Sequence, residues 1–461
     1  MNWEYLYTTQ RLTGRTDQGV NPDKLRTSFM RDYDRLIFSA AFRKLQNKTQ
    51  VFPLPGVVFV HNRLTHSLEV ASVGRSLGRQ VGSSIARQHP DADEAFLNFY
   101  NYELGNVITS ACLAHDIGNP PFGHSGEDAI RNYFRNVKGD IQRVLRQELS
   151  REELADFEYF EGNSNALRVL THTFNEPASA YNLTLTTLAS IIKYPTAAHC
   201  GFRQGAGIVA KKAGYFQSEK EVFHRIMSAF HLKALDEDTY VRHPFVFLTE
   251  AADDICYRVI DIEDAERLGI VSLEEMKALF LPCFAAETGF NALEKVTEQL
   301  SQFHDPHQQA QYIRARWIGL MVEKTSEVFM EHQAAILDGT FGMSLLDALP
   351  EHLLDQIRAI NRFSVERIYN HKNVIEVELA GFNVIGILLD AFIEALVYPH
   401  NQKSVKLLQL VEPQYKTDVK GQRLYDNILS VIDFISGMTD NHAIDLYRKI
   451  KGIDITGFHR F

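Results

Sequence analysis

A helix stop flanked by metal-ligand side chains constrains this chain more than any other stretch of its sequence. Residues 115–124 read HDIGNPPFGH, and Gly118, Pro120 and Pro121 cannot continue a helix. His115 and Asp116 are therefore expected at a rigid helix end, where an imidazole and a carboxylate offer a divalent cation one nitrogen and one oxygen ligand. A His-Asp pair alone is weak evidence, because short motifs occur by chance and are often surface pairs.

Two further segments supply matching ligands. An amphipathic run after His61 has apolar residues near helical spacing, which puts His66 in the first turns of a helix. On a second predicted helix, residues 249–261, Asp253, Tyr257 and Asp261 recur every four residues and share one face. The alternative for His66 is a helix cap or a place in the core. The alternative for Asp253, Tyr257 and Asp261 is a solvent-exposed stripe on the helix. Because the second helix is largely apolar, we expect its row to be partly buried, and buried carboxylates need partners or a metal.

Composition limits the class of protein. The 461 residues carry a net charge of -10, which gives no global attraction for nucleic acid or an anionic membrane. The four cysteines, Cys112, Cys200, Cys256 and Cys283, form no CxxC pair and are interpreted as buried reduced thiols. The amino terminus has no basic and apolar leader pattern. These features favour a cytoplasmic enzyme without a membrane segment.

The pattern along the chain is mainly helical, with polar loops expected at residues 193–214 and 417–422. Residues 57–60 and 374–384 alternate like short strands. We therefore predict an all-α protein with one or two short β-hairpins. Residues 1–265 are expected to form the metal-bearing catalytic core. Residues 266–461 are expected to form a helical carboxy-terminal region that packs on this core and completes the nucleotide pocket and the oligomer contacts.

The order His66, His115-Asp116, Asp253 resembles the H…HD…D signature of the HD-domain metal-dependent phosphohydrolases. Further blocks are similar to the bacterial dGTP triphosphohydrolases: residues 115–124 with Glu127, 46–53 (QNKTQVFP), 160–163 (FEGN), 250–257 (EAADDICY) and 436–440 (SGMTD). These blocks spread over almost the whole chain. The resemblance implies a helical HD core and one divalent metal ion per subunit (manganese, magnesium or another metal), held by His66, His115, Asp116 and Asp253. It also implies hydrolysis of dGTP, or of dNTPs more broadly, to deoxynucleoside and tripolyphosphate.

A candidate catalytic pair follows the helix stop. Ser125 is expected to cap a new helix, which places Glu127 in its first turn near His124. A carboxylate beside an imidazole raises the pKa of the ring and orients it, as a general acid or base requires. The alternative is that Glu127 only interacts with the helix dipole. The resemblance implies a catalytic pair, with the choice between acid and base left open.

Substrate contacts fall into three groups. Surface lysines are usually only solubilising, but the resemblance implies polyphosphate contacts for Lys193, Tyr194 and one of the Lys211–Lys212 pair, and Arg63 is a further cationic candidate. For the sugar, Tyr257 and Asp261 with Gln50 are placed to exclude a 2′ hydroxyl and to bind the 3′ hydroxyl. For the base, Tyr369 and Glu378 match positions that line the guanine pocket in the dGTP triphosphohydrolases.

Two other classes of function stay open at this point. One is an HD-domain phosphodiesterase or nucleotidase that acts on another phosphoester. The other is a nucleotide sensor or nucleic-acid-binding protein that keeps the site without turnover, which the presence of both His124 and Glu127 disfavours. The resemblance implies a homo-oligomer, a hexamer or a tetramer. Single-stranded DNA or a dNTP is conceivable as an activator, although the acidic composition does not support the former.

Overall fold

The computed structural model describes residues 1–13, 26–52, 60–174, 181–201, 207–415 and 418–454. Within these ranges no β-strand forms, and only isolated bridges pair extended residues. The first half of the chain contains α1 (Ser28–Ile37), α2 (Ala40–Lys44), α3 (Arg63–Gln88), α4 (Glu94–Asn98), α5 (Leu104–Ala114), α6 (His124–Asn136), α7 (Gly139–Glu148), α8 (Arg151–Glu158), α9 (Gly162–Thr171), α10 (Leu185–Ala189) and α11 (Lys220–Ala229). The all-α prediction is confirmed.

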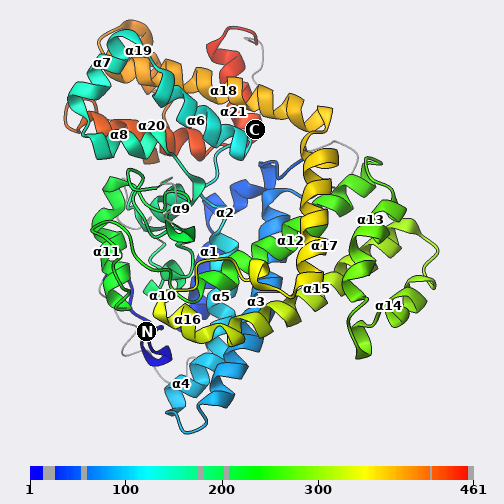
Figure 1. Ribbon diagram of the computed structural model, residues 1–461. Helices are drawn as coiled ribbons and strands as arrows, with labels where there is room; N and C mark the ends of the chain where they lie inside the picture. Colours follow the sequence, from blue (N-terminus) through cyan, green and yellow to red (C-terminus); the bar gives the residue numbers. More distant parts are fainter. Residues whose placement is uncertain (14–25, 53–59, 175–180, 202–206, 416–417, 455–461) are drawn as a thin grey trace.

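The second half of the chain is also helical (Figure 1). It contains α12 (Val246–Arg267), α13 (Leu273–Phe280), α14 (Leu293–Leu300), α15 (Pro306–Glu331), α16 (Gln333–Asp338), α17 (Glu351–Ser364), α18 (Lys372–Val397), α19 (Gln402–Leu408), α20 (Leu424–Ser436) and α21 (Asp440–Ile450). Within the described ranges, two π-helical turns occur, η3 (Phe99–Glu103) and η10 (Val365–Tyr369). The 3₁₀ turns are η1 (Trp3–Tyr5), η2 (Leu45–Asn47), η5 (Ile208–Ala210), η6 (Gln217–Glu219), η7 (Leu281–Phe284), η8 (Gly289–Asn291), η9 (Leu346–Ala348) and η11 (Pro413–Tyr415).

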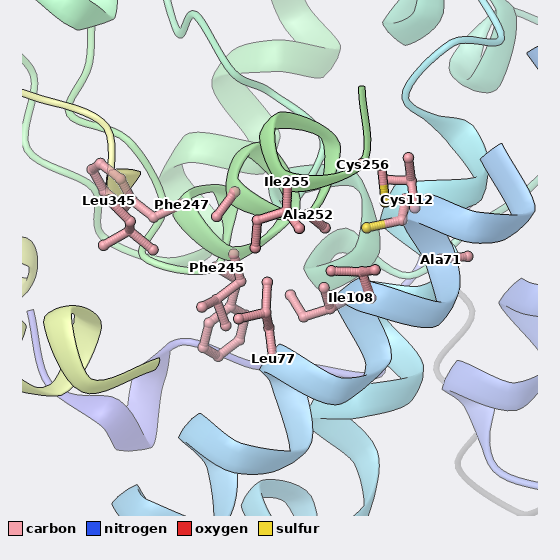
Figure 2. Packing of buried hydrophobic residues seen from close by; sticks show 14 of the residues in the cluster. Ala71, Leu77, Ile108, Cys112, Phe245, Phe247, Ala252, Ile255, Cys256 and Leu345 are labelled. Atoms are coloured by element: carbon pink, nitrogen blue, oxygen red, sulfur yellow. The ribbon is translucent and has the colours of Figure 1, made fainter. Parts of the chain in front are cut away.

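The larger of two main apolar cores surrounds α3, α5 and α12, with α15 packed against α3 and α12. Figure 2 shows side chains of these helices meeting in it, among them Leu77, Ile108, Cys112, Ala252, Ile255 and Cys256. Small residues let α3 and α5 approach closely: a Cβ added at Gly78 would lie 3.0 Å from Cα of Gly105. All four cysteines are buried and free, as predicted. This core brings the first turn of α3, the end of α5 and the middle of α12 together.

The second core joins distant parts of the chain. Apolar residues of α6 and α8, such as Ile130 and Phe157, pack with residues of α18, α20 and α21, such as Leu388 and Ile432. In Figure 1, α6, α7 and α8 accordingly lie beside α18 to α21, apart from α3, α5, α12 and α15. The division at residue 265 stays a prediction, but the packing shows that residues on its two sides share one core.

The strand predicted at residues 374–384 is wrong, because this segment lies inside the α18 helix. The alternation rested on Ile375, Val377 and Leu379, yet Ile375 and Leu379 are also one helical turn apart, and both are exposed. The buried residues of α18 follow helical spacing instead, as Val384, Leu388 and neighbouring positions do. Tertiary packing therefore overrides the β-propensity of the segment. The other predicted strand, residues 57–60, lies outside the described residues except for Val60.

α18 is also the one helix in the described ranges that is long and apolar enough to cross a membrane by length and composition. Its most apolar window has a mean hydropathy of 1.8, and 56% of that window is buried in the protein. α18 contacts α6, α19, α20 and α21, so the structure assigns it to a protein core.

Candidate active site

Four side chains from three helices converge at the point where α3, α5 and α12 meet. Asn62 and Thr65 form a capping box that starts α3 and sets His66 in its first turns. His115 ends α5 and Asp116 follows it, as the helix stop predicted. Oδ1 of Asp253, on α12, lies 3.1 Å from Nε2 of His66 and 3.6 Å from Nε2 of His115.

The atoms of this cluster suit a cation. Ligand atoms of His66, His115 and Asp116 all lie within 4.8 Å of one another. Nδ1 of His115 lies 2.6 Å from the Cys112 carbonyl oxygen and donates to it, so Nε2 carries the lone pair. That Nε2 atom is buried and has no hydrogen-bond partner among the described residues. A buried imidazole nitrogen without a partner, among carboxylate oxygens, fits a divalent metal ion.

Neighbouring groups hold the carboxylates in their ionised form. Burial by itself would raise the pKa of Asp116, but Arg63 and His115 outweigh it and lower that pKa. Nη1 of Arg63 donates to Oδ2 of Asp116 at 2.8 Å, and Nδ2 of Asn119 donates to Oδ1. Burial also opposes ionisation of Asp253, whose pKa is nevertheless held well below its usual range by the imidazoles of the cluster. Arg63 therefore orients a carboxylate of the cluster while it lines the cavity.

A second pair lies at the start of α6. Nδ1 of His124 lies 2.9 Å from Oε2 of Glu127, and this hydrogen bond raises the pKa of His124. Glu127 is buried, and its Oε1 accepts the N–H of Gly162 at 2.6 Å. The side chain of His124 is 80% exposed and lines the cavity. An oriented imidazole with a raised pKa can transfer a proton to or from a bound molecule.

The cap predicted for this helix is wrong by two residues. α6 begins at His124, and its N-cap is Gly123, which has a φ of 56°. Ser125 lies inside the first turn, and its hydroxyl donates to the carbonyl oxygen of Glu378 on α18. A left-handed turn at Phe122 and Gly123, whose φ values are 62° and 56°, starts the helix earlier than a serine cap would.

Two of the candidate lysines, Lys193 and Lys212, form ion pairs with carboxylates. Nζ of Lys193 lies 3.3 Å from Oε1 of Glu250, and Nζ of Lys212 lies 2.9 Å from Oε2 of Glu161. Lys211 is exposed and forms part of the same cavity wall. The ring of Tyr194 is buried, with the ammonium group of Lys193 5.8 Å from its centre. Each lysine that has such a carboxylate partner is held in a defined direction.

A row of polar groups continues along α12. Tyr257 is half-buried, whereas Asp261 is buried and accepts a hydrogen bond from the hydroxyl of Tyr369 at 2.7 Å. Burial raises the pKa of Asp261 to about 7, against the opposing effect of this hydrogen bond. Oε1 of Gln50 is buried and has no hydrogen-bond partner in the described part of the chain. Burial also raises the pKa of Glu378 on α18. The predicted partly buried row is therefore confirmed.

One cavity of about 550 Å³ unites these groups. Its lining includes all sixteen residues singled out from the sequence, namely Gln50, Arg63, His66, His115, Asp116, His124, Glu127, Lys193, Tyr194, Lys211, Lys212, Asp253, Tyr257, Asp261, Tyr369 and Glu378.

Several residues of the site were missed. Asp254 lines the cavity, and burial raises its pKa to about 6. Arg242 forms an ion pair with Glu250 and thereby orders the carboxylate next to Lys193. The acidic residues at 250, 253 and 254 recur at helical spacing, a signal that could have identified them. Nothing local in the sequence points to Arg242.

A second group with metal-ligand side chains lies elsewhere, at His199, Cys200 and Asp238. Nζ of Lys220 lies 2.7 Å from Oδ1 of Asp238, and the hydroxyl of Tyr215 donates to the same atom. A cation would have to displace the ammonium group, so this group fits a metal less well than the first.

The comparisons with known proteins agree with this geometry. Residues 63–194 match the HD domain, and residues 348–449 match the phosphohydrolase-associated domain. A deoxyguanosinetriphosphate triphosphohydrolase-like protein of Synechocystis is 36% identical over 99% of this chain and 100% of its own length. A protein of the same description from Pseudomonas aeruginosa is 36% identical over 98% and 99%. The deoxyguanosinetriphosphate triphosphohydrolase of Cronobacter sakazakii is 30% identical over 98% of both chains. The chain therefore belongs to the HD-domain family of deoxyguanosinetriphosphate triphosphohydrolase-like proteins.

Proposed function

We propose that the protein hydrolyses deoxynucleoside triphosphates, with dGTP as the leading substrate, to deoxynucleoside and tripolyphosphate. One observation carries the proposal: a single cavity combines a His/Asp cluster, the His124–Glu127 pair, lysines and tyrosine rings. Such a set offers partners for every part of a nucleotide, because cations bind the polyphosphate and aromatic rings pack on sugar and base. The names of the relatives, which describe deoxyguanosinetriphosphate triphosphohydrolases, support dGTP and an intact triphosphate product.

We assign one divalent ion, manganese, magnesium or another metal, to His66, His115, Asp116 and Asp253. The unpartnered Nε2 atom of His115 supports this assignment. Two nitrogen and two oxygen ligands suit a borderline-hard cation and leave coordination positions open. When bound there, such an ion polarises a phosphoryl oxygen and lowers the pKa of a coordinated water.

Proton transfer is assigned to His124. Glu127 holds the ring through Nδ1 and raises the pKa of His124, which favours the protonated form of the imidazole. Cleavage leaves negative charge on the departing oxygen of the deoxynucleoside, which a protonated imidazole can neutralise. Because Glu127 is buried and bonded to the Gly162 amide, the ring is oriented before substrate enters.

The polyphosphate is assigned to Lys193, Tyr194 and Lys212, with Arg63 near the reacting phosphoryl group. Lys212 is favoured over Lys211 because an ion pair directs it and Lys211 is exposed. Positive charge at these positions binds the triphosphate and offsets the negative charge that develops on it in the transition state, while the deoxynucleoside oxygen departs.

The deoxyribose is assigned to Tyr257, Asp261 and Gln50, and the base to Tyr369 and Glu378. The unpartnered Oε1 of Gln50 and the buried carboxyl group of Asp261 supply hydrogen-bonding capacity for a sugar hydroxyl. The Glu378 carboxylate can accept hydrogen bonds from guanine N1 and N2.

We also propose that the enzyme acts in the cytoplasm as a homo-oligomer, a hexamer or a tetramer. Exposed apolar side chains support an association surface: Val365 is 50% exposed and Leu379 is 61% exposed. Light scattering measures the oligomeric state directly.

Product analysis tests the proposed reaction. The protein is incubated with each of the four dNTPs and with GTP, in manganese or magnesium, and anion-exchange chromatography identifies the phosphate product. We expect tripolyphosphate from dGTP and much less from GTP. Pyrophosphate or orthophosphate as the first product would identify another phosphoester hydrolase, and tight dGTP binding without product would identify a sensor. Each dNTP and single-stranded DNA is added in turn as an activator.

A metal-ligand variant and a matched control test the proposed metal site in the same assay. Asp116→Asn should abolish turnover because it removes a proposed metal ligand, and metal content measured by atomic absorption should fall with it. Asp128→Asn is the matched control, since the Asp128 side chain is 62% exposed and, within the described residues, forms an ion pair only with Arg131. Unchanged turnover by Asp116→Asn would overturn the site.

A further inference from the structure

A short segment outside the HD-matching region, residues 436–440, contacts residues that line the cavity. Its last residue, Asp440, begins α21 and is buried. Oδ1 of Asp440 accepts the backbone N–H of Phe122 at 3.0 Å, and Oδ2 accepts the backbone N–H of Thr49 at 2.8 Å. Phe122 and Thr49 both line the cavity. One carboxylate therefore ties two separate loops of the site together.

A second link joins the same segment to the loop that follows His115 and Asp116, residues 117–123. Nζ of Lys48 donates to the carbonyl oxygen of Asn119 at 2.6 Å and to that of Ser436 at 2.8 Å. Lys48 is buried, and burial together with the charge of Arg63 lowers its pKa to about 7. An ammonium group in such a place is retained only with good acceptors. Residues 436–440 and Lys48 are here called the clasp. The clasp holds the loop 117–123 at Asn119, before its two prolines, and at Phe122, after them.

The loop needs this support because its backbone is strained. Phe122 has a φ of 62°, a left-handed conformation that costs a non-glycine residue about 1 kcal/mol or more. The ring of Phe122 packs where Gly381 of α18 leaves room, since a Cβ at Gly381 would clash with it. His124 follows two residues later and begins α6. The direction of His124 therefore depends on a turn that distant residues hold in place.

We propose that Asp440 is a positioning residue for the reaction, acting through the Phe122 and Thr49 amides to fix His124 and Gln50 against the bound nucleotide. This inference rests on the proposed hydrolysis. Removal of the carboxylate leaves two buried N–H groups without an acceptor. Relaxation of the strained turn would then move His124 away from the leaving oxygen, and a displacement of about 1 Å costs roughly 100-fold in rate.

Steady-state kinetics with dGTP test the proposal. Asp440→Ala should lower kcat at least tenfold and change KM less than threefold, because the polyphosphate contacts lie elsewhere. Asp440→Asn, which keeps one acceptor oxygen, should recover part of kcat. Asp445→Asn on the exposed side of α21 is the control and should match the wild type. Normal kcat in a folded Asp440→Ala variant would overturn the proposal, as would a loss of kcat that Asp440→Asn does not partly recover.

Hydrogen exchange without substrate gives a readout that is independent of turnover. In Asp440→Ala, peptides containing Phe122 and Thr49 should exchange faster, while peptides from α3 and α5 stay protected. Gly381→Ala provides a second route if Asp440→Ala fails to fold, because the added methyl displaces the Phe122 ring without touching the carboxylate. It should also lower kcat. If the wild type turns over no triphosphate, the proposed function fails, whereas unchanged exchange at Phe122 and Thr49 refutes the clasp itself.

Discussion

The hydroxyl group of Tyr369 donates a 2.7 Å hydrogen bond to Oδ2 of Asp261 and thereby joins the π-helical turn before α18 to α12. Asp261 is buried, and its pKa of about 7 means that both protonation states occur near neutral pH. The contact closes one wall of the cavity with residues that lie far apart in the sequence.

Tyr369→Phe should therefore destabilise the protein more at high pH than at low pH. Above pH 7 the variant leaves an ionised, buried carboxylate without its donor, which costs about 1–3 kcal/mol. The pKa of Asp261 is raised in the folded state, so at pH 5 the group is protonated and the loss is smaller. Urea unfolding in EDTA at pH 5 and pH 8 measures the difference. Tyr398→Phe, at a tyrosine that is 43% exposed, is the control. An equal loss at both pH values would contradict this assignment.

Glu127→Gln should lower kcat by about 100-fold or more, the usual range for loss of general acid-base assistance. The carboxylate raises the pKa of His124, so its removal should also shift the His124 limb of the pH–rate profile to lower pH. The profile of kcat from pH 5 to 9 measures both effects, with Asp128→Asn as the neighbouring control. A profile with an unmoved limb would show that the pair does not govern proton transfer.

Lys212→Gln and Lys211→Gln should separate the two adjacent lysines. Lys212 is half-buried and directed by Glu161, and its loss should raise KM for dGTP about tenfold, which corresponds to about 1.4 kcal/mol. Lys211 is exposed, and its loss should change KM less than twofold. Initial rates across a dGTP series decide between them. The reverse ranking would assign the triphosphate contact to Lys211.

His243 should make the protein acid-sensitive. Its Nε2–H donates to the Leu6 carbonyl oxygen at 3.1 Å and its Nδ1 accepts the Phe245 N–H at 3.3 Å, an arrangement that only the neutral ring permits. Burial lowers the pKa of His243 to about 3. Since the unfolded state binds the proton more readily, stability is present above about pH 6.5 and falls as pH drops toward 3.

From pH 7 to pH 5 this histidine should cost about 2 kcal/mol of unfolding free energy. Urea titrations at both values measure the change, and His243→Asn should reduce the slope with pH. His304→Asn, at an exposed position, should leave the slope as it is. A slope that survives in His243→Asn would assign the acid sensitivity to other groups.

Local rules predicted the helices that carry the four candidate metal ligands. Prolines end α5 at the His115 pair, spacing puts His66 at the start of α3, and a four-residue repeat sets Asp253 and Asp261 on one face of α12. The convergence of these elements came from the family resemblance, since spacing alone cannot bring separate helices together.

The failures have a common physical cause. The strand prediction at residues 374–384 failed because the buried positions of α18, among them Val384 and Leu388, follow helical spacing, and the packing of this helix against α6 and α20 selects the helix. The cap prediction at Ser125 failed because a turn stabilised by Asp440 starts α6 at His124. In each case a partner far away in the chain selects the local conformation, and no local pattern contains that information.

The shared core of α6 with α18 and α20 has a consequence for biosynthesis. Ile130 and Phe134 of α6 find their apolar neighbours in helices close to the end of the chain. The ribosome must therefore synthesise α18 and α20 before α6, which carries His124 and Glu127, can pack against them. These two side chains reach their native positions only after the helices of the second core have left the ribosome.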